Sequence, residues 1–211
     1  MVYYFTSNVV SPSADIYAGK DKVENEDLIK YGLEEDVWFH ADKLSSAHIY
    51  LRMKAGESWE AIDEGILTDC AQLTKANSIE GNKKDNVTII YTPWANLKKD
   101  GSMAVGQVGF KDPRKVKKIL VPQRENPIVN RLNKTKIEKF PDLQMEREEK
   151  LKAIRKRDQA ARLERKKEEA RVAEERKQKK WQKDHAYDEM FQEQDPEVPN
   201  NQDGYDSDDF M

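Results

Sequence analysis

Cysteine is almost missing from this chain of 211 residues, which contains only Cys70. A single thiol excludes an internal disulfide framework and a zinc site built from several cysteines, and it fits a reducing compartment. Cys70 lies among apolar residues, and no basic residue precedes it nearby to stabilise a thiolate. We therefore interpret Cys70 as a small buried core residue.

Long hydrophobic runs are also lacking. No stretch of about 18 apolar residues occurs, and the most apolar segment, residues 103–121, carries charges at its centre. The first residues have neither a basic region nor an apolar core of the kind found in secretory signals. The sequence thus predicts no integral membrane span. We expect a cytoplasmic location, and leave open a nuclear one and peripheral membrane association through a partner.

Charge is distributed unevenly. Residues 1–127 contain 17 Lys+Arg and 19 Asp+Glu, residues 128–183 contain 20 and 11, and residues 184–211 contain none and 10. The net charge of −3 therefore hides a near-neutral segment, a basic segment and an acidic tail. Such asymmetry indicates contacts with nucleic acid.

These segments predict an α+β protein with three parts. Residues 1–127 form a compact mixed α/β domain, residues 128–183 a basic charged helix, and residues 184–211 an acidic tail that we expect to be disordered. In the domain we expect strands at 2–6, 14–18, 37–41, 47–53 and 87–91, helices at 26–31 (capped by Asn25) and 60–76, and a hairpin of 105–110 with 116–121.

The charged segment begins with an expected connecting helix at 127–139, which Pro141 interrupts. Residues 142–183 contain neither Pro nor Gly, and opposite charges stand one turn apart, as in Glu146 and Lys150. The apolar residues do not repeat as a sustained heptad. A solitary charged helix is favoured, and a coiled coil that depends on a partner stays open.

Two neighbouring strands are expected to present one polar and aromatic surface. If they pair with aligned faces, strand alternation places Trp38, His40, His48 and Arg52 on the same side. Rings of this kind can stack on unpaired bases, and a guanidinium can bind phosphate. The alternative is that Trp38 belongs to the core and that both histidines are internal polar groups.

The same region contains the residue types of a hydrolase, because Asp42 and Ser45 lie close to His40 and His48 in the sequence. Two histidines and an aspartate could also ligate a metal. No Gly-x-Ser-x-Gly elbow and no phosphate-binding Gly-x-x-x-x-Gly-Lys loop occurs. We therefore expect no enzymatic activity, no cofactor and no metal.

Basic residues supply the candidate phosphate contacts, although exposed lysines are often only solvated. In the domain these are Lys20, Lys22, Lys98 and Lys99. In the helix they are Arg155, Lys156, Arg157, Arg165, Lys166 and Lys167. Ser207 stands among acidic residues of the tail and is a candidate phosphorylation site.

Residues 19–110 carry a recognisable set of motifs: Gly-Lys-Asp-Lys at 19–22, Glu-Asp-Val-Trp-Phe-His at 35–40, Leu-Ser-Ser-Ala-His at 44–48, Tyr-Thr-Pro-Trp at 91–94 and Gly-Gln-Val-Gly-Phe at 106–110. This set resembles the NFACT RNA-binding (NFACT-R) domain family. Larger relatives in that family are ribosome-associated quality-control factors, and some help to extend the tails of stalled nascent chains. This chain lacks their other NFACT domain, so the resemblance implies RNA binding without tail extension.

We conclude from the sequence that the chain is a non-enzymatic nucleic-acid-binding adaptor. The resemblance implies that the partner is RNA, with ribosomal or transfer RNA as the expected classes. Phosphate contacts alone do not separate RNA from DNA, so a DNA-binding or DNA-sensing protein stays open. Two alternatives from other classes also stay open: a protein-interaction scaffold that acts through the charged helix, and a small hydrolase that uses His40 and His48.

Overall fold

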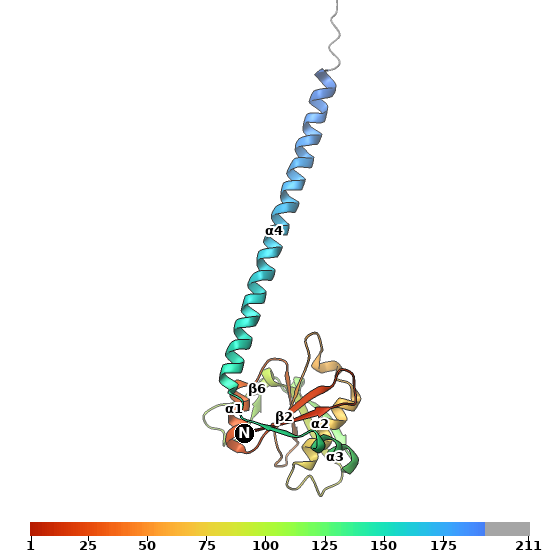
Figure 1. The fold of residues 1–211 in the computed structure, drawn as a ribbon, viewed down its shortest axis with the longest axis vertical. Coiled ribbons are helices and arrows are strands. Elements are labelled where there is room, and N and C mark those ends of the chain that lie inside the picture. The colour runs from red at the N-terminus through yellow and green to blue at the C-terminus, as the bar shows by residue number, and fades with distance from the viewer. Residues whose placement is uncertain (193–211) are drawn as a thin grey trace, which may run out of the picture. The chain divides into compact units, whose positions relative to one another are not determined.

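The computed structural model describes residues 1–192, with side chains described as far as residue 186. Figure 1 follows the chain from the N-terminus to the end of the last helix. The strands are β1 (Val2–Ser7), β2 (Ala14–Gly19), β3 (Asp36–Ala41), β4 (Ile49–Arg52), β5 (Val87–Pro93), β6 (Leu97–Lys98), β7 (Gly109–Phe110), β8 (Lys117–Val121) and β9 (Ile137–Lys139). The α-helices are α1 (Lys22–Tyr31), α2 (Glu64–Ala76), α3 (Asn126–Lys134) and α4 (Leu143–Gln192), with short 3-10 turns η1 (Trp59–Ala61), η2 (Trp94–Asn96) and η3 (Pro113–Lys115).

An antiparallel sheet of seven strands organises the domain, in the order β8-β5-β3-β4-β2-β1-β9, and β6 pairs with β7 in a separate two-stranded sheet. The predicted α+β class and the long C-terminal helix are both confirmed. Helices α2 and α3 lie on one side of the large sheet, while α1 and β6 lie on the other (Figure 1). The central strands are therefore covered on both faces.

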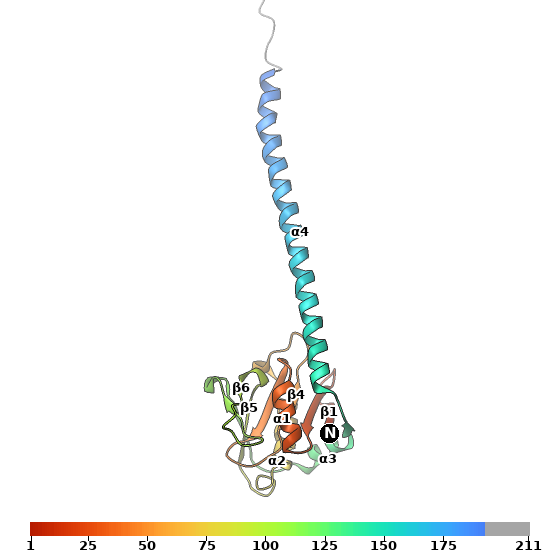
Figure 2. The ribbon, with the colours of Figure 1, turned by 90° about the vertical axis from the view of Figure 1, so that its left-hand side faces the viewer.

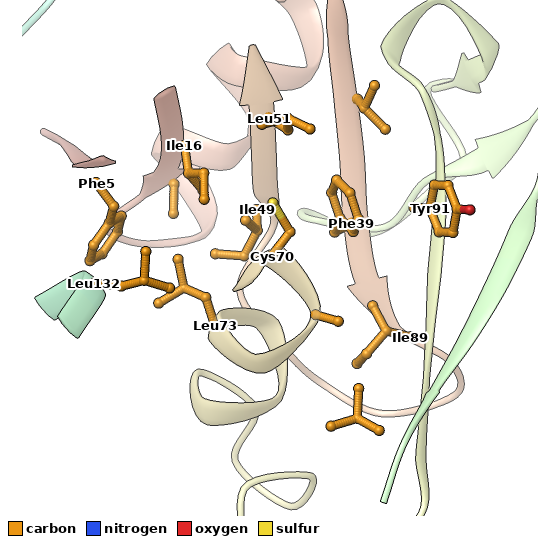
Figure 3. Close-up of a cluster of buried hydrophobic side chains, with 14 of the residues drawn as sticks. Phe5, Ile16, Phe39, Ile49, Leu51, Cys70, Leu73, Ile89, Tyr91 and Leu132 are labelled. Atoms are coloured by element: carbon orange, nitrogen blue, oxygen red, sulfur yellow. The ribbon is translucent and has the colours of Figure 1, made fainter. Parts of the chain in front are cut away.

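The main core fills the space between the sheet and α2 and α3. Alternate residues of the central strands β3 and β4, including Phe39 and Ile49, are at most 1% exposed there, and Cys70 and Leu73 of α2 pack against them (Figure 3). Leu132 brings α3 into the same cluster. Cys70 is thus the buried core residue that the sequence predicted, and burial raises the pKa of its thiol.

The opposite face of the sheet carries a second hydrophobic cluster, which lies beneath α1. Helix α1 faces the viewer in Figure 2. Trp38, Tyr50 and Leu28 are each at most 2% exposed in it. Helix α1 begins earlier than predicted because Asp21, rather than Asn25, is its cap. The Asp21 carboxylate accepts from the backbone N–H groups of Val23 and Glu24 at 2.9 and 3.0 Å.

The predicted hairpin of 105–110 with 116–121 is wrong. Strand β8 pairs with the long central strand β5, and β7 pairs with β6. Gly106 has a φ of +79°, which interrupts the extended segment before β7. The segment 94–110 therefore leaves the large sheet and lies over the face that carries Trp38, against which the ring of Phe110 packs.

The expected helix at 127–139 is also shorter than predicted. It ends at Lys134, after which β9 pairs with β1. The Thr135 hydroxyl accepts from the Thr6 backbone N–H at 2.9 Å and so draws the chain to the sheet edge. The compact unit extends to Lys152, so part of the predicted charged segment belongs to the folded domain.

Helix α4 runs to Gln192, so residues 184–192, which we expected to start a disordered tail, are helical. The remainder of the predicted tail, including Ser207, lies outside the described residues. Within the described part of the chain, no helix combines the length and apolar character that a bilayer crossing requires.

Candidate nucleic-acid interface

Trp38, His40 and His48 lie together, as strand alternation predicted. The Trp38 and His40 rings stack with centroids 5.3 Å apart, and the Trp38 indole Nε1–H donates to His48 Nδ1 at 2.9 Å. However, Trp38 is 2% and His48 3% exposed because α1 and the segment 94–110 cover this face. Only His40 is partly exposed. The expected open stacking surface is therefore an internal cluster.

Burial also decides the charge of the two histidines. Desolvation, followed by the neighbouring His40, lowers the pKa of His48 to about 4. Desolvation lowers the pKa of His40 as well. Since His48 Nδ1 accepts from Trp38, its ring proton resides on Nε2. His48 is thus neutral near pH 7 and contributes no positive charge toward a phosphate.

Arg52, predicted as a phosphate ligand, is bound inside the domain. Its Nε donates to Asp36 Oδ1 at 2.9 Å, and its Nη2 donates to Asp36 Oδ2 at 3.2 Å. The Asp36 side chain is 0% exposed and also accepts from the Tyr17 hydroxyl at 2.6 Å. Although burial opposes the charged form, the hydrogen bond to Asp36 raises the pKa of Arg52. Arg52 is therefore a structural cation that neutralises a buried carboxylate.

The hydrolase alternative finds no support in the contacts of these side chains. His40 Nδ1 lies 2.8 Å from the Ala41 carbonyl, and Asp42 accepts from Lys118 Nζ at 3.2 Å. Neither histidine bonds to Ser45, and among the described residues no cluster of His, Cys, Asp and Glu suits a metal ion. The arrangement lacks the hydrogen-bonded nucleophile and base of a catalytic triad.

Lys99 is also committed to the fold. Its ammonium donates to Glu26 Oε1 and to the Ala104 carbonyl at 2.8 Å each, and to the Gln107 carbonyl at 3.0 Å. These contacts use all three of its N–H bonds. Burial is the largest single influence on the pKa of Glu26 and raises it, but the hydrogen bonds from Lys99 and from the Gly106 backbone N–H, together with the charge of Lys99, lower the pKa overall. Lys99 therefore ties the loop 99–108 to α1.

A basic cavity of about 500 Å³, which we call the lysine pocket, lies between α1 and the segment 94–99. Ile29, Trp94 and Leu97 form its apolar wall. Its charged lining comprises Lys30, Lys98, Lys99 and Lys111 together with Glu26 and Asp27. Lys30, Lys98 and Lys111 are exposed. Lys99 already faces Glu26, and Lys111 Nζ donates to the Ala95 carbonyl at 2.8 Å but keeps two further N–H bonds. Lys30, Lys98 and Lys111 can therefore still contact an anion, against one further carboxylate, that of Asp27.

Trp94 is a fixed wall of the lysine pocket. Its Nε1–H donates to the Ile29 carbonyl at 2.8 Å, and the Arg147 guanidinium of α4 lies 4.9 Å from its ring centroid. A Cβ at Gly32 would approach the indole nitrogen to 2.3 Å, so only glycine fits beside the ring. Sequence reasoning missed Lys30 and Lys111, and the only available signal was their proximity to predicted turns.

Lys20 and Lys22 lie elsewhere, beside a second cavity of about 290 Å³ near the start of α1. Both side chains are exposed. Asn25 also lines this cavity, and its buried Oδ1 has no hydrogen-bond partner among the described residues. The predicted domain lysines therefore lie in two places, Lys98 and Lys99 at the lysine pocket and Lys20 and Lys22 beside the second cavity.

The predicted basic residues of α4 fall into two groups. Arg157, Arg165 and Lys167 form ion pairs with neighbouring acids at 3.9, 3.5 and 3.3 Å. Arg155, Lys156 and Lys166 form none within the described part of the helix. Sequence spacing alone did not distinguish the two groups.

Comparisons with known proteins identify the family of the N-terminal domain. A family model described as "NFACT protein RNA binding domain" matches residues 1–112. Coiled-coil domain-containing protein 25 of Bos taurus is 60% identical over 149 residues, which cover 70% of this chain and 72% of that protein. Protein JLP2 of Saccharomyces cerevisiae is 44% identical over 149 residues, which cover 68% of this chain and 72% of that protein.

A solved structure shares the fold at low sequence identity. It is the C-terminal part of the fibronectin/fibrinogen-binding protein from Streptococcus suis, which is 20% identical with a TM-score of 0.50. The match covers 64% of this chain and 48% of that chain. At this identity the likeness concerns the fold alone.

Proposed function

The chain belongs to the family of NFACT RNA-binding domains, and on this premise we propose that it is a non-enzymatic adaptor that binds RNA through the lysine pocket. The supporting observation is the cluster of exposed lysines around one cavity in a domain that is near neutral overall. Bulk charge cannot draw RNA to such a domain, so local placement of cations must do so.

The lysine pocket is suited to a phosphate and its sugar more than to a stacked base. Lys30, Lys98 and Lys111 provide ammonium groups around the opening, while both Trp94 and Lys99 are held by other contacts. Binding of this kind depends on salt and reads little sequence. The expected partners are structured RNAs, and by family resemblance we propose ribosomal or transfer RNA and a role in ribosome-associated quality control.

A salt titration of RNA binding by the full chain tests the proposal. Changing Lys98 and Lys111 to Gln should remove up to two phosphate contacts and make the slope of log affinity against log salt shallower by about 0.7 for each. The matched control changes Lys83 and Lys134, which are exposed and line neither cavity described above. Equal effects of the two double variants would refute the assignment of the pocket.

Two other functions remain to be separated by experiment. Competition between RNA and DNA of the same length addresses DNA binding, because only RNA offers the 2′-hydroxyl. A scaffold that acts through α4 instead predicts a protein partner whose recovery survives the Lys98 and Lys111 changes. The scaffold is favoured only if that partner is recovered while the full chain fails to bind RNA at low salt.

A further inference from the structure

Basic and acidic residues of α4 lie at different angles around the helix axis, which the overall composition of the helix does not reveal. With about 100° between successive residues, nine positions between 152 and 180 fall within one arc of roughly 80°. Six of these positions are basic and none is acidic. We call these six residues the basic face: Lys152, Arg155, Arg162, Lys166, Lys177 and Lys180. All the acidic residues of this stretch lie outside the arc.

The ion pairs of α4 confirm that the basic face is left uncompensated within the helix. The pairs between residues 152 and 180 join Arg157, Arg165, Lys167 and Arg171 to neighbouring acids. No member of the basic face takes part in an ion pair among the described residues. All six are exposed. Between residues 152 and 180 the other sides carry seven basic and six acidic residues, so they are nearly neutral, while the basic face stays positive over about 42 Å.

The surroundings of the basic face favour a nucleic-acid backbone over a membrane. A helix that lies in a lipid surface needs a broad apolar face opposite or beside its charges. Here Leu163 and Trp181 flank the arc, 55% and 61% exposed, but they stand 18 residues apart. Val172 lies on another side of the helix. Of these residues only Trp181 carries a ring; one of its faces stacks on His185 with centroids 4.2 Å apart, and an exposed ring beside lysines suits stacking on a single unpaired base.

We propose that the basic face of α4 is a second RNA-binding surface, which tracks a run of phosphates along the helix and acts independently of the lysine pocket. The identity of the polyanion rests on the proposed function of the domain. The position of the surface rests only on the charge segregation and ion pairing of α4. A domain contact and a separate helix contact on one chain would raise the apparent affinity for long RNAs above that of either site.

Two six-residue variants of the full chain test the proposal. In the first, every residue of the basic face is changed to Gln, which keeps good helix propensity. The matched control changes the same number of basic residues on the other sides: Lys156, Arg157, Arg165, Lys167, Arg171 and Lys179. Both variants lose the same charge. Binding of an oligouridylate longer than the face is measured against salt, and helix content is checked by circular dichroism.

The basic-face variant should lose about 10-fold to 100-fold in affinity at low salt, and its salt slope should become shallower by about 2 to 4, whereas the control should change affinity by less than about threefold. Equal losses in both variants would show that bulk charge acts and would overturn the proposal. An unchanged slope in the basic-face variant, or binding confined to vesicles of anionic lipid, would also overturn it.

The lysine-pocket variant Lys98→Gln with Lys111→Gln distinguishes this proposal from the proposed function. If only the pocket variant weakens binding, the basic face is wrong and the domain assignment stands. If only the basic-face variant weakens binding, the domain assignment is wrong and the helix surface stands. Additive losses in a combined variant support both sites.

Discussion

The indole Nε1–H of Trp38 donates to His48 Nδ1 at 2.9 Å, with both side chains almost fully buried. This bond requires a neutral imidazole, since a protonated ring has no acceptor. Burial and the neighbouring His40 favour the same state and lower the pKa of His48 to about 4. The contact between Trp38 and His48 is therefore a pH-sensitive structural bond inside the domain.

We predict that the domain loses stability as the pH falls from about 6.5 toward 4. Because the pKa of His48 is lower in the folded chain than in the unfolded chain, the unfolded chain takes up the proton first. The stability due to neutral His48 is present above about pH 6.5 and is lost as the pH falls. The loss from this residue can reach roughly 3 kcal/mol. Urea unfolding at several pH values measures it.

The matched variant is His48→Gln, which keeps a polar side chain without a titratable ring. Its free energy of unfolding should be lower than that of the unmodified chain at pH 7 but should depend less on pH between 6.5 and 4. His40 contributes in the same direction because its pKa is also lowered. A pH profile that is unchanged by His48→Gln would contradict the assignment.

A second prediction concerns Arg52 and Asp36. Arg52→Met leaves the buried Asp36 carboxylate without its ion pair, so unfolding should become easier by about 3 kcal/mol. Adding Asp36→Asn removes the uncompensated charge and should restore part of the loss. A double-mutant cycle by urea unfolding measures the coupling. If Arg52 instead served RNA, Arg52→Met would weaken binding while leaving stability unchanged.

These results show how far sequence patterns reach. Alternation in residues 37–41 and 47–53 placed the Trp38 and His48 rings on one face, and the structure confirms it. The pattern could not show that this face is covered. The residues that cover it come from α1 and the segment 94–110, and they leave β3 buried on both faces of the sheet. Similarly, the predicted pairing of 116–121 with its sequence neighbour gave way to pairing with β5, a longer strand.

The role of Lys99 was hidden for a related reason. Two of its acceptors are backbone carbonyls, which no residue pattern reveals, and the third belongs to Glu26, 73 residues away. Adjacent Lys98 has the same chemistry in the sequence but is exposed at the pocket. The two lysines differ in their burial and in their hydrogen-bond partners, and both of these depend on the tertiary structure.

This separation gives a third prediction. Lys99→Met should loosen the loop 99–108, because it removes three hydrogen bonds that hold the loop in place. The local opening free energy should fall by about 1–3 kcal/mol. Hydrogen exchange of residues 104–107 measures it. Lys98→Met is the control and should leave exchange unchanged, and equal effects of the two substitutions would contradict the prediction.

A fourth prediction concerns the oligomeric state of α4. In the heptad frame that starts at Leu151 and Ile154, the next core positions include Asp158, Arg165 and Glu168. Burying these charges in a seam is costly, so we expect the full chain to be monomeric at micromolar concentration. Light scattering combined with gel filtration measures the mass. Changing Asp158, Arg165 and Glu168 to Leu should complete an apolar seam and produce a dimer. A concentration-dependent dimer of the unmodified chain would contradict this expectation, and it would favour the coiled-coil alternative for α4.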